Sequence, residues 1–419
     1  MKQSIFARVY RLSLSPMQSK IFRMSWTVNV VSCIGTQLHH VNEKLQMGHL
    51  TTSPFWMSCI EASSSLSIML LGVAAGVVAD RMDRRKLLII THAFMLACAA
   101  TLSGLTFFGL TTPKILISAA FLIGTGTALS MPAYQAIVPE LVEDENLLPQ
   151  GVSLNSAGYN MSRIVGPFAG GCIFAAFGAH WAFLINALSF LGIIVALVMW
   201  KRYPTKTPHV CVNESFWVAM CSGLSSVCQS KHFSIAVVWA LGYGWFGGVS
   251  FSLLPSLIIH NMKASPVIFG LLVSCLGIGA VIITFFLPFL RSRFKTNVIL
   301  VVFGIFAAAS QAVLSWTNST IIIGICLVVA GMSWLSIMST VNISIHLSFS
   351  DWMKARAFGV YYMFWGAATS LGATFWGRLA TRVGVRVAFG YSAIGMLLIL
   401  AILSRVKITT LDSKYKLAI

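Results

Sequence analysis

One carboxylate, Glu61, interrupts a long apolar stretch of the sequence. It lies in the first third of the segment 54–78, which is long enough to span a lipid bilayer as a helix. At 1.5 Å per residue, its side chain would lie roughly 12 Å below the beginning of that helix. A carboxylate at this depth is costly and by default functional. We therefore predict that Glu61 binds and releases a proton. The alternative is a carboxylate in a water-filled vestibule that has no coupling role.

Arg163 is the basic counterpart of Glu61, because it lies in the middle of another apolar segment, 151–176. A buried guanidinium needs partners, and three kinds are available here. It could pair with Glu61, contact an anionic substrate, or bond carbonyl groups exposed near Pro167. A structural role and a role in substrate binding or coupling both stay open.

Polar residues also gather at the end of the first apolar segment, 22–44. His39 and Glu43 are one helical turn apart, as are His40 and Lys44, so each pair can meet on one helix face. If the helix is long, they form a polar wall inside the protein. If it ends near Gln37, they are interfacial residues, and this second arrangement is the one we expect.

The elements that position these residues follow from the composition. The chain has 419 residues, of which 57% are hydrophobic and 10% charged, with a mean hydropathy of +0.83. A soluble protein is nearer 25% charged, so a soluble enzyme, a disordered chain and a nucleic-acid binder are excluded. Twelve apolar segments predict an all-α membrane protein with twelve transmembrane helices. They are 22–44, 54–78, 87–110, 115–137, 151–176, 179–200, 233–259, 266–290, 297–316, 319–345, 357–380 and 386–405.

The net charge of +18 fits the same interpretation. Basic residues collect on the cytoplasmic side of membrane proteins. With the N-terminus inside, most of the 29 lysines and arginines fall in cytoplasmic segments. We therefore expect a multi-pass protein of the plasma membrane, a bacterial inner membrane, with both termini cytoplasmic.

The longest polar interruption, 201–232, divides the chain into two halves of six helices each. The expected organisation is an N-terminal half (1–200), a cytoplasmic linker (201–232) and a C-terminal half (233–419). Both halves have a basic loop after their second span and a polar loop after their fourth. Such pseudo-symmetric halves are typical of a transporter whose site lies between them.

Other chemistry is poorly supported by the sequence. The nine cysteines form no CxxC pair, the nine histidines include no HExxH motif, and no GxxxxGK[ST] loop occurs. We therefore expect no catalytic residue set, no metal site, no cofactor and no direct use of ATP. The protein is not expected to be an enzyme.

Two motifs point to a known superfamily. The loop from Gly76 to Arg85 contains Asp80-Arg81-Met82-Asp83-Arg84-Arg85 and resembles the signature loop GxxxD(R/K)xGR(R/K) of the major facilitator superfamily, with Asp83 in place of the usual glycine. After Arg163, the residues Gly166, Pro167, Gly170 and Gly171 resemble the GPxxGG motif of the exporters in that superfamily. The resemblance implies the major facilitator fold.

Longer stretches narrow the resemblance. They are 35–37, 52–54, 132–142, 154–163, 352–357 and 375–377. Together they resemble the exporter branch that contains the enterobactin exporter and the transmembrane secretion effectors. The polar sequence from His39 to Lys44 departs from that branch, where this run is usually apolar. Since spans one, four, seven and ten line the cavity in the superfamily, the departure bears on the choice of substrate.

The resemblance also assigns roles at the cytoplasmic side. It implies that Asp80 contacts the start of span eleven and latches the outward-open state, within a gate formed with Arg81, Arg84 and Arg85. Glu140, just after span four, is a reasonable partner for Arg84 or Arg85. Pro167 and its flanking glycines favour a bend or a seal where the halves meet.

The second half has no carboxylate within its predicted spans. Its polar and aromatic residues are the candidates for a wall that suits an aromatic or amphipathic ligand. They include Tyr243, Trp334, Asn342 and Tyr361.

These observations predict a secondary transporter that exports a small organic or amphipathic molecule, of the siderophore or drug class, against an inward flow of protons. Its partners would be that substrate, protons and the bilayer, without nucleic acid, and it would function as a monomer. Uptake of a nutrient or lipid is the alternative within transport. A membrane receptor or assembly factor that transports nothing is the alternative outside it.

Overall fold

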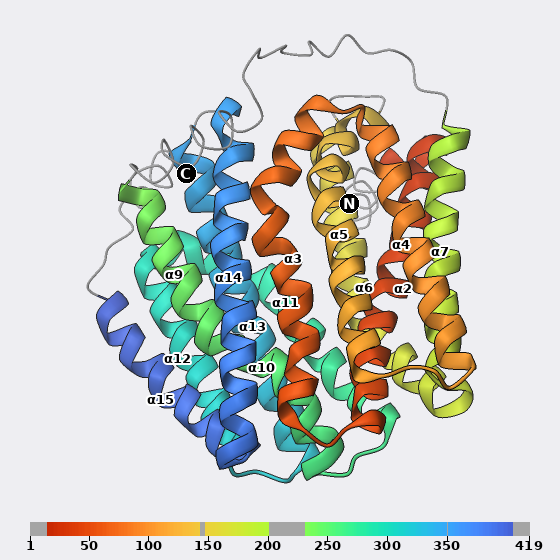
Figure 1. Cartoon of the computed structure of the whole chain (residues 1–419). Helices are drawn as coiled ribbons and strands as arrows, with labels where there is room; N and C mark the ends of the chain where they lie inside the picture. The colour runs from red at the N-terminus through yellow and green to blue at the C-terminus, as the bar shows by residue number, and fades with distance from the viewer. Residues whose placement is uncertain (1–14, 143–146, 201–230, 350, 405–419) are drawn as a thin grey trace, which may run out of the picture.

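The computed structural model describes residues 15–142, 147–200, 231–349 and 351–404, and long helices make up nearly all of them (Figure 1). The first half contains η1 (Ser15–Gln18), α2 (Lys20–Leu50), α3 (Pro54–Arg81), α4 (Arg84–Phe107), α5 (Pro113–Leu141), α6 (Leu148–Phe177) and α7 (Ala179–Met199). The second half contains α9 (Lys231–Gly247), α10 (Val249–Ser252), η3 (Ser256–Asn261), α11 (Pro266–Arg293), α12 (Thr296–Leu314), α13 (Thr320–Ser348), α14 (Asp351–Val383) and α15 (Val385–Leu403).

Twelve spans result, because α9, α10 and η3 follow one another as a single broken span over Phe233–Asn261. Within the described ranges, nine spans are long and apolar enough to cross a membrane by their own composition. The other three, α2, α6 and α14, contain more polar residues. Of these three, α2 holds His39 and Glu43, and α6 holds Arg163. The prediction of an all-α protein with twelve helical spans is confirmed.

Helix ends follow ordinary sequence signals. The side chains of Ser19, Asp83, Thr112 and Ser265 accept hydrogen bonds from the first turns of α2, α4, α5 and α11. Proline stands in the first turn of α3, α5, α6 and α11, where its missing N–H costs nothing. The short helix–helix turns that result keep successive spans antiparallel.

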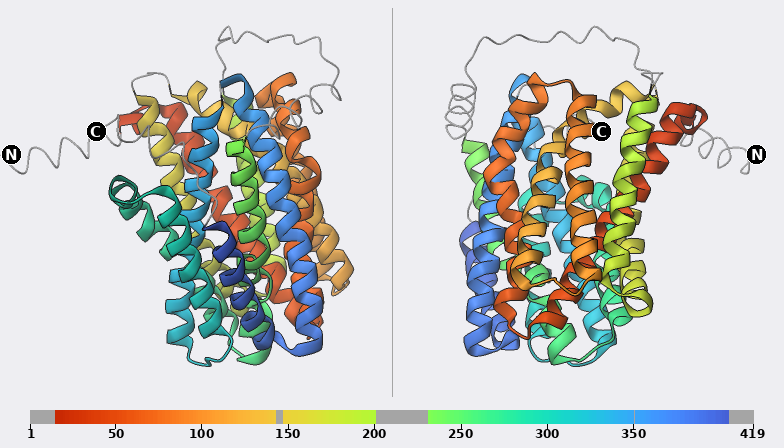
Figure 2. Two further views of the ribbon diagram at one scale, coloured as in Figure 1. Left: turned by 90° about the vertical axis from the view of Figure 1, so that its left-hand side faces the viewer. Right: turned by 45° about the vertical axis from the view of Figure 1, so that its right-hand side comes forward.

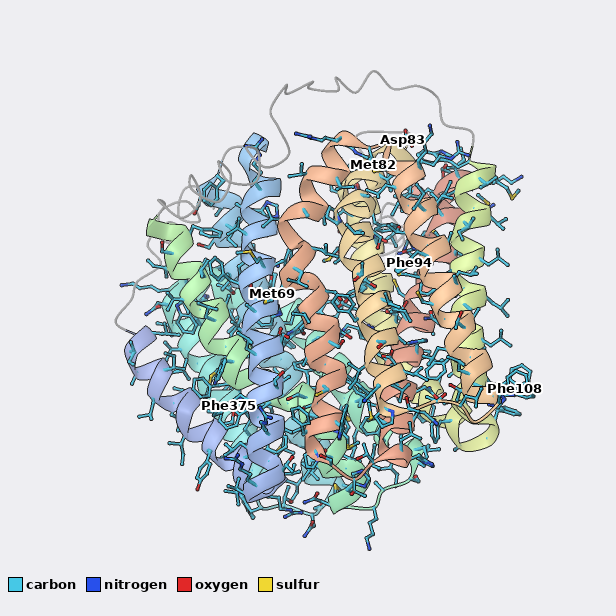
Figure 3. All side chains as sticks on the ribbon, in the orientation of Figure 1. Met69, Met82, Asp83, Phe94, Phe108 and Phe375 are labelled. Atoms are coloured by element: carbon cyan, nitrogen blue, oxygen red, sulfur yellow. The ribbon has the colours of Figure 1, made fainter. Side chains whose placement is uncertain are left out.

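The helix bundle has two ends. We call the end where α7 stops and α9 starts the linker end, and the opposite end, where the two halves share a core, the sealed end. At the linker end lie the α3–α4 turn with Met82 and Asp83, the α11–α12 turn, the last residues of α7 and the first of α9. At the sealed end lie the α2–α3, α4–α5 and η3–α11 connections, among others. Figure 3 places Met82 and Asp83 at the end opposite Phe108.

The buried core differs between these ends. At the sealed end, one hydrophobic cluster contains side chains of both halves, such as Leu45, Met57, Leu257 and Phe269. Toward the linker end, separate clusters fill the first half, around Phe22 and Leu88, and the second half, around Trp239. The halves therefore share a core at the sealed end and have their own cores at the other.

Two helix pairs make the main contact between the halves: α3 with α14, and α6 with α11 (Figure 1). Glycines allow these backbones to approach closely. A Cβ added to Gly72 of α3 would lie 3.0 Å from the carbonyl oxygen of Gly359 on α14. The left view of Figure 2 shows the linker-end tip of α11 standing clear of α6. The α6–α11 contact therefore does not extend to the linker end.

The outer surface of the bundle suits lipid. Large apolar side chains on it are exposed, among them Phe94, Phe285, Phe375 and Leu398 (Figure 3). Exposed apolar patches of this extent mark a membrane-contacting surface.

Candidate functional site

An ion pair joins the first two spans deep in the structure. The Lys44 Nζ on α2 donates to the Glu61 Oε2 on α3 at 2.9 Å. Their side chains are 17% and 30% exposed, so the pair is neither dry nor fully solvated. The same Nζ lies 3.4 Å from the carbonyl oxygen of Phe251, just after the beginning of α10 in the second half. Lys44 therefore links the predicted proton-binding carboxylate to the opposite half.

A second polar group on α2 is centred on Glu43, the residue before Lys44. The Glu43 carboxylate is completely buried and contacts two imidazoles: the His39 Nε2 lies 3.2 Å from its Oε1, and the His40 Nδ1 lies 3.1 Å from its Oε2. The His39 ring is also fully buried and packs on the Phe183 ring of α7, with centroids 4.6 Å apart. Both carboxylate oxygens of Glu43 are thus satisfied without solvent.

This arrangement contradicts our expectation for the end of the first span. We expected a helix that ends near Gln37 and leaves His39 to Lys44 at the interface. Instead α2 continues to Leu50, and His39 and Glu43 lie inside it. The helix can continue because its polar side chains bond one another at helical spacing, so burial leaves few polar groups unpaired. Glu61 is therefore not the sole carboxylate well inside a span.

Arg163 of α6 contacts the opposite half through an aromatic ring. Its guanidinium carbon lies 4.0 Å from the centroid of the Trp334 ring on α13, a close cation–π contact. One of its terminal nitrogens, NH1, is buried and has no hydrogen-bond partner within the described part of the chain. The partner of Glu61 is Lys44, so a direct Arg163–Glu61 pair is not formed.

These contacts connect into one chain across the two halves. The Trp334 ring packs on the Phe251 ring, with centroids 6.2 Å apart, and Lys44 approaches the Phe251 carbonyl. The order is Arg163, Trp334, Phe251, Lys44 and Glu61, from helices α6, α13, α10, α2 and α3. A movement of the halves must change this set of contacts, because it alternates between them.

The GPxxGG residues have two distinct packing partners. Gly166 and Gly170 lie against α2, where a Cβ on Gly170 would meet the Asn42 Nδ2 and the Leu38 carbonyl, each at 3.1 Å. Gly171 and Pro167 face α11 instead: a Cβ on Gly171 would overlap the carbonyl of Pro266 and lie 3.2 Å from the Gly270 Cα. The motif therefore holds α6 between its own half and the opposite one.

Known proteins resemble this chain in sequence and in fold. The sequence profile of the transmembrane secretion effectors matches residues 12–418, nearly the whole chain. The chain belongs to the transmembrane secretion effector family.

Two of the curated relatives of this chain are named for the compounds that they move. The chain is 29% identical to the staphyloferrin A transporter of Staphylococcus aureus over 225 residues, which cover 53% of this chain and 55% of that protein. It is 24% identical to macrolide efflux protein A of Streptococcus pyogenes over 255 residues, covering 59% and 60%. The chain thus spans about half the length of the curated relatives it matches.

Solved transporter structures share the fold of this chain, the major facilitator fold. A variant of the nucleoside transporter NupG aligns with a TM-score of 0.73 at 13% identity, covering 91% of this chain and 98% of that one. A bacterial homologue of the lysosomal transporter Spinster, in an inward-facing and unoccupied conformation, aligns with a TM-score of 0.69 at 13% identity, covering 96% and 98%. At such identity the likeness concerns the fold alone.

The signature loop of this chain has Asp83 where the usual pattern has a glycine, and the structure gives Asp83 a role at the start of α4. Asp83, which replaces a glycine, is the N-cap of α4, and its Oδ1 accepts a bond from the Lys86 amide at 2.9 Å. Arg85 donates to the carbonyls of Leu197 and Val198, at 2.7 and 2.9 Å, near the end of α7. Cations are favoured there by the helix dipole.

The other predicted gate residues are placed by their backbones. Asp80 and Arg81 end α3, Arg84 begins α4, and Glu140 lies in the last turn of α5. The side chains of Asp80 and Glu140 lie outside the described residues. The predicted latch and the Glu140 pairing therefore remain predictions.

Three candidates from the second half lie apart from the chain of contacts. Tyr243 and Tyr361 are buried in the core of the second half, where Tyr243 stacks on Trp365 and the Tyr361 hydroxyl lies 3.3 Å from the Met338 Sδ. Asn342 lies two turns beyond Trp334 on α13, and its buried Oδ1 has no partner among the residues described. Tyr243 and Tyr361 are therefore buried in this state, and their place in a wall for the ligand stays a prediction.

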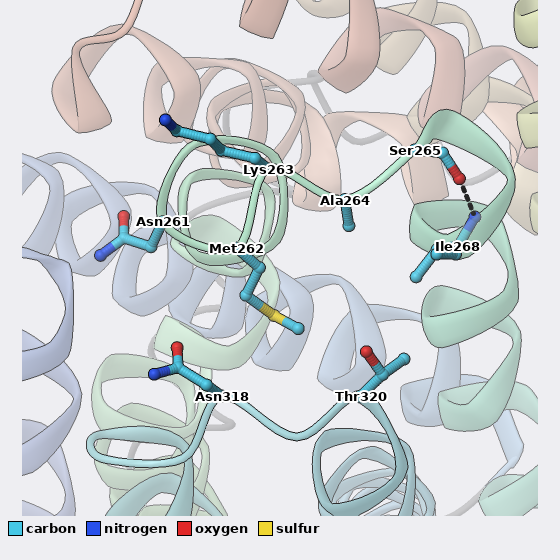
Figure 4. Close-up of a pocket in the computed structure, with 8 residues that line it drawn as sticks. All are labelled: Asn261, Met262, Lys263, Ala264, Ser265, Ile268, Asn318 and Thr320. Carbon is cyan, nitrogen blue, oxygen red and sulfur yellow. Dashed lines mark hydrogen bonds between the residues drawn. The ribbon is translucent and has the colours of Figure 1, made fainter.

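A pocket of about 540 Å³ opens at the sealed end of the second half (Figure 4). Its lining comes from the η3–α11 and α12–α13 connections and includes Asn261, Lys263, Ser265 and Asn318. It lies at the surface of one half, so it does not belong to the contacts between them. In the described ranges, no group of three or more His, Cys, Asp or Glu residues could hold a metal ion.

The sequence does not reveal three contributors to this site. The expected end of the first span near Gln37 places Glu43 and Lys44 at the interface. The spacing of Glu43 four residues after His39 was the available signal, but the length of α2 decides whether that signal is buried. Phe251 contributes a backbone carbonyl, which no residue type reveals.

Proposed function

We propose that this protein is a proton-coupled exporter of a small organic molecule, which it moves by alternating access to one site between its halves. The observation that carries the proposal is the chain of contacts from Arg163 to Glu61. It joins a cation without a carboxylate partner in the described structure to the Glu61 carboxylate, which is paired with Lys44. The names of the relatives, a siderophore transporter and an efflux protein, support this class of substrate.

The orientation belongs to the proposal. We place the linker end in the cytoplasm, because basic residues gather in its turns, among them Arg84, Arg85 and Arg293. The protein would then lie in the plasma membrane with both termini inside. In this orientation, the state described here is sealed toward the outside by the core that the halves share.

Each residue has a role in the proposed cycle. Arg163 and Trp334 contact the substrate: the guanidinium offers its unpartnered nitrogen to an acceptor group, and the indole offers an aromatic face. Glu61 exchanges a proton as Lys44 approaches or leaves it. A carrier needs a group whose interactions differ between its two open states, and the Lys44–Glu61–Phe251 contact has that property because it spans the halves.

Transport by an Arg163→Gln variant tests the substrate site. We expect accumulation of staphyloferrin A or a macrolide in inverted vesicles with an acidic interior, and a loss of about tenfold or more in the variant. Arg293→Gln is the matched control, because Arg293 also lies over an aromatic ring, Phe289 at 5.8 Å, but at the exposed end of α11. It should transport normally.

Three results would contradict this proposal. Equal transport by Arg163→Gln and the wild-type protein would remove the substrate role of the arginine. Accumulation in right-side-out vesicles instead would favour uptake. The absence of substrate-dependent proton movement with any tested compound would favour a receptor or assembly factor.

A further inference from the structure

One face of α2 packs against the second half, and His40 lies where that contact stops. At helical spacing along this face, the Thr51 carbonyl contacts the His260 Nε2 at 3.1 Å, and a Cβ on Gly48 would lie 3.1 Å from Ile259. Lys44 follows with its bond to the Phe251 carbonyl. His40 is the next residue on this face, and its side chain is 33% exposed. The histidine therefore borders the sealed region on the side of the linker end.

The charges around His40 do not balance without an added proton. Glu43 and Glu61 supply two negative charges, and Lys44 supplies one positive charge. The Glu43 side chain is fully buried. While Glu61 is ionised and both histidines are neutral, one negative charge is left over. An uncompensated charge in a buried site is costly. One proton on an imidazole removes this cost.

The geometry selects the histidine that takes this proton. An ionised carboxylate only accepts hydrogen bonds, so His39 must donate through Nε2 and His40 through Nδ1. The remaining nitrogen of His39, Nδ1, is buried and has no partner among the described residues, so protonating it would bury an unsatisfied donor. The side chain of His40 is partly exposed, so its Nε2 can receive a proton from water.

The other titratable groups on the neighbouring elements do not replace this arrangement. Helix α2 packs against η1, α3, α5, α6, α7 and η3, and Glu61 of α3 is the carboxylate within electrostatic reach of His40. Arg163 of α6 stacks on Trp334, and His260 of η3 bonds the Thr51 carbonyl. The rest lie at helix ends or are neutral phenols and thiols: Lys114, Tyr134 and Glu140 of α5, Tyr159 and Cys172 of α6, Cys59, Asp80 and Arg81 of α3, and His180 of α7.

We propose that His40 is a second proton-binding site, with Glu43 as its buried counter-charge and His39 as the residue that positions the carboxylate. This inference rests on the proposed function and extends it, because the carrier would then bind protons at Glu61 and at His40. The step forms an Nε2–H bond on His40 with a proton from water. The imidazolium stays bonded to Glu43 through its Nδ1.

Nitrogen NMR of the full-length protein, with its histidines labelled with ¹⁵N, tests this site without any substrate. The His40 signals are identified by their loss in His40→Gln. We expect neutral His40 to carry its proton on Nδ1 at high pH, and to become protonated at both nitrogens as the pH is lowered. His39 should keep a single neutral tautomer, protonated on Nε2, over the same range.

Variants at Glu43 separate a built site from an ordinary exposed histidine. Glu43→Gln removes the counter-charge, so the doubly protonated form of His40 should appear at a pH at least about one unit lower, a tenfold weaker proton affinity. Glu43→Asp keeps the charge and serves as the control if the amide variant folds poorly. An unchanged His40 titration in Glu43→Gln would overturn the proposal, as would a shift of the same size in Glu43→Asp or protonation of His39 in place of His40.

The outcome is independent of the transport assay. If His40 titrates as expected but transport shows no proton dependence, the proton site stands and the proposed function fails. If transport is proton-coupled but the titration of His40 does not depend on Glu43, the second site fails and the exporter remains.

Discussion

Glu61→Gln is expected to abolish gradient-driven export while substrate exchange at equal concentrations continues. The amide has the shape of the protonated acid but cannot release a proton, so Glu61 would be locked in one charge state. Lys44 would then lack its 2.9 Å ionic partner in every state of the cycle. We expect accumulation against a gradient to fall by about tenfold or more, which corresponds to at least about 1.4 kcal/mol in the rate-limiting step.

Two further variants show whether charge is the cause. Glu61→Asp keeps an ionisable group near Lys44 and should retain part of the activity with an altered pH profile. Lys44→Gln combined with Glu61→Gln restores electrical balance, so it should be as stable as the wild-type protein but uncoupled. Normal accumulation by Glu61→Gln at every pH would show that Glu61 is a vestibule carboxylate, and coupling would have to use His40 and Glu43 or no proton.

Enlarging the glycines between α6 and α11 is expected to have an effect of similar size. In the described state, the Gly171 and Gly270 backbones meet so closely that a Cβ on Gly270 would overlap the Pro167 carbonyl and lie 3.1 Å from the Gly171 Cα. The obstructing atoms belong to backbone, which cannot rotate away. Gly270→Leu should therefore force the two helices apart, lower the stability by roughly 1–3 kcal/mol and stop transport.

Gly104, a glycine of the first half that lies away from the α6–α11 contact, provides the control. Gly104 lies near the end of α4, and a Cβ there would meet no atom within 4 Å. Gly104→Ala should leave transport unchanged and raise the stability slightly, since alanine is the better helix former by roughly 0.5–1 kcal/mol. Thermal unfolding in detergent and vesicle transport measure both effects. A Gly270→Leu protein that unfolds and transports like the wild type would show that the helices need not stay this close.

The fold could be predicted from the sequence because hydropathy and chain length leave few alternatives. Apolar segments near 20 residues must be helices in lipid, and twelve of them with a central linker predict two halves. Glu61 and Arg163 were identified for the same reason, since each interrupts an apolar segment. These arguments need only one helix at a time.

The connections of these residues could not be predicted in the same way. Whether His39 and Glu43 are buried depends on how far α2 continues past Gln37, and that depends on bonds among the polar residues themselves. The partner of Glu61 was open because Lys44 and Arg163 are both basic, and only the packing of α2 on α3 decides between them. The break in the seventh span, which places the Phe251 carbonyl near Lys44, depends on tertiary contacts.

Tyr243 and Tyr361 show what residue type alone leaves open. Aromatic residues in a span can face substrate, lipid or the core of their own half, and residue type does not distinguish these. Both are at most 4% exposed and pack within the second half. Trp334, by contrast, is reached by a side chain from the first half, and this contact makes it part of the site.

The most direct test of alternating access measures distances at both ends of the molecule. Spin labels replace Leu110 and Trp316 at the sealed end, or Met82 and Phe294 at the linker end, in protein whose native cysteines have been replaced. All four positions are exposed, by 60%, 69%, 39% and 52% respectively, and each pair joins the two halves. Pulsed electron resonance in lipid nanodiscs then gives the distance distributions between pH 5 and 8.5, with and without a transported compound.

Our account predicts two populations that respond in opposite senses. As pH or substrate changes, the sealed-end distance should lengthen in the molecules whose linker-end distance shortens, and Glu61→Gln should make this balance insensitive to pH. A single distance distribution at each end, unchanged under every condition, would contradict the claim that this protein alternates between two open states.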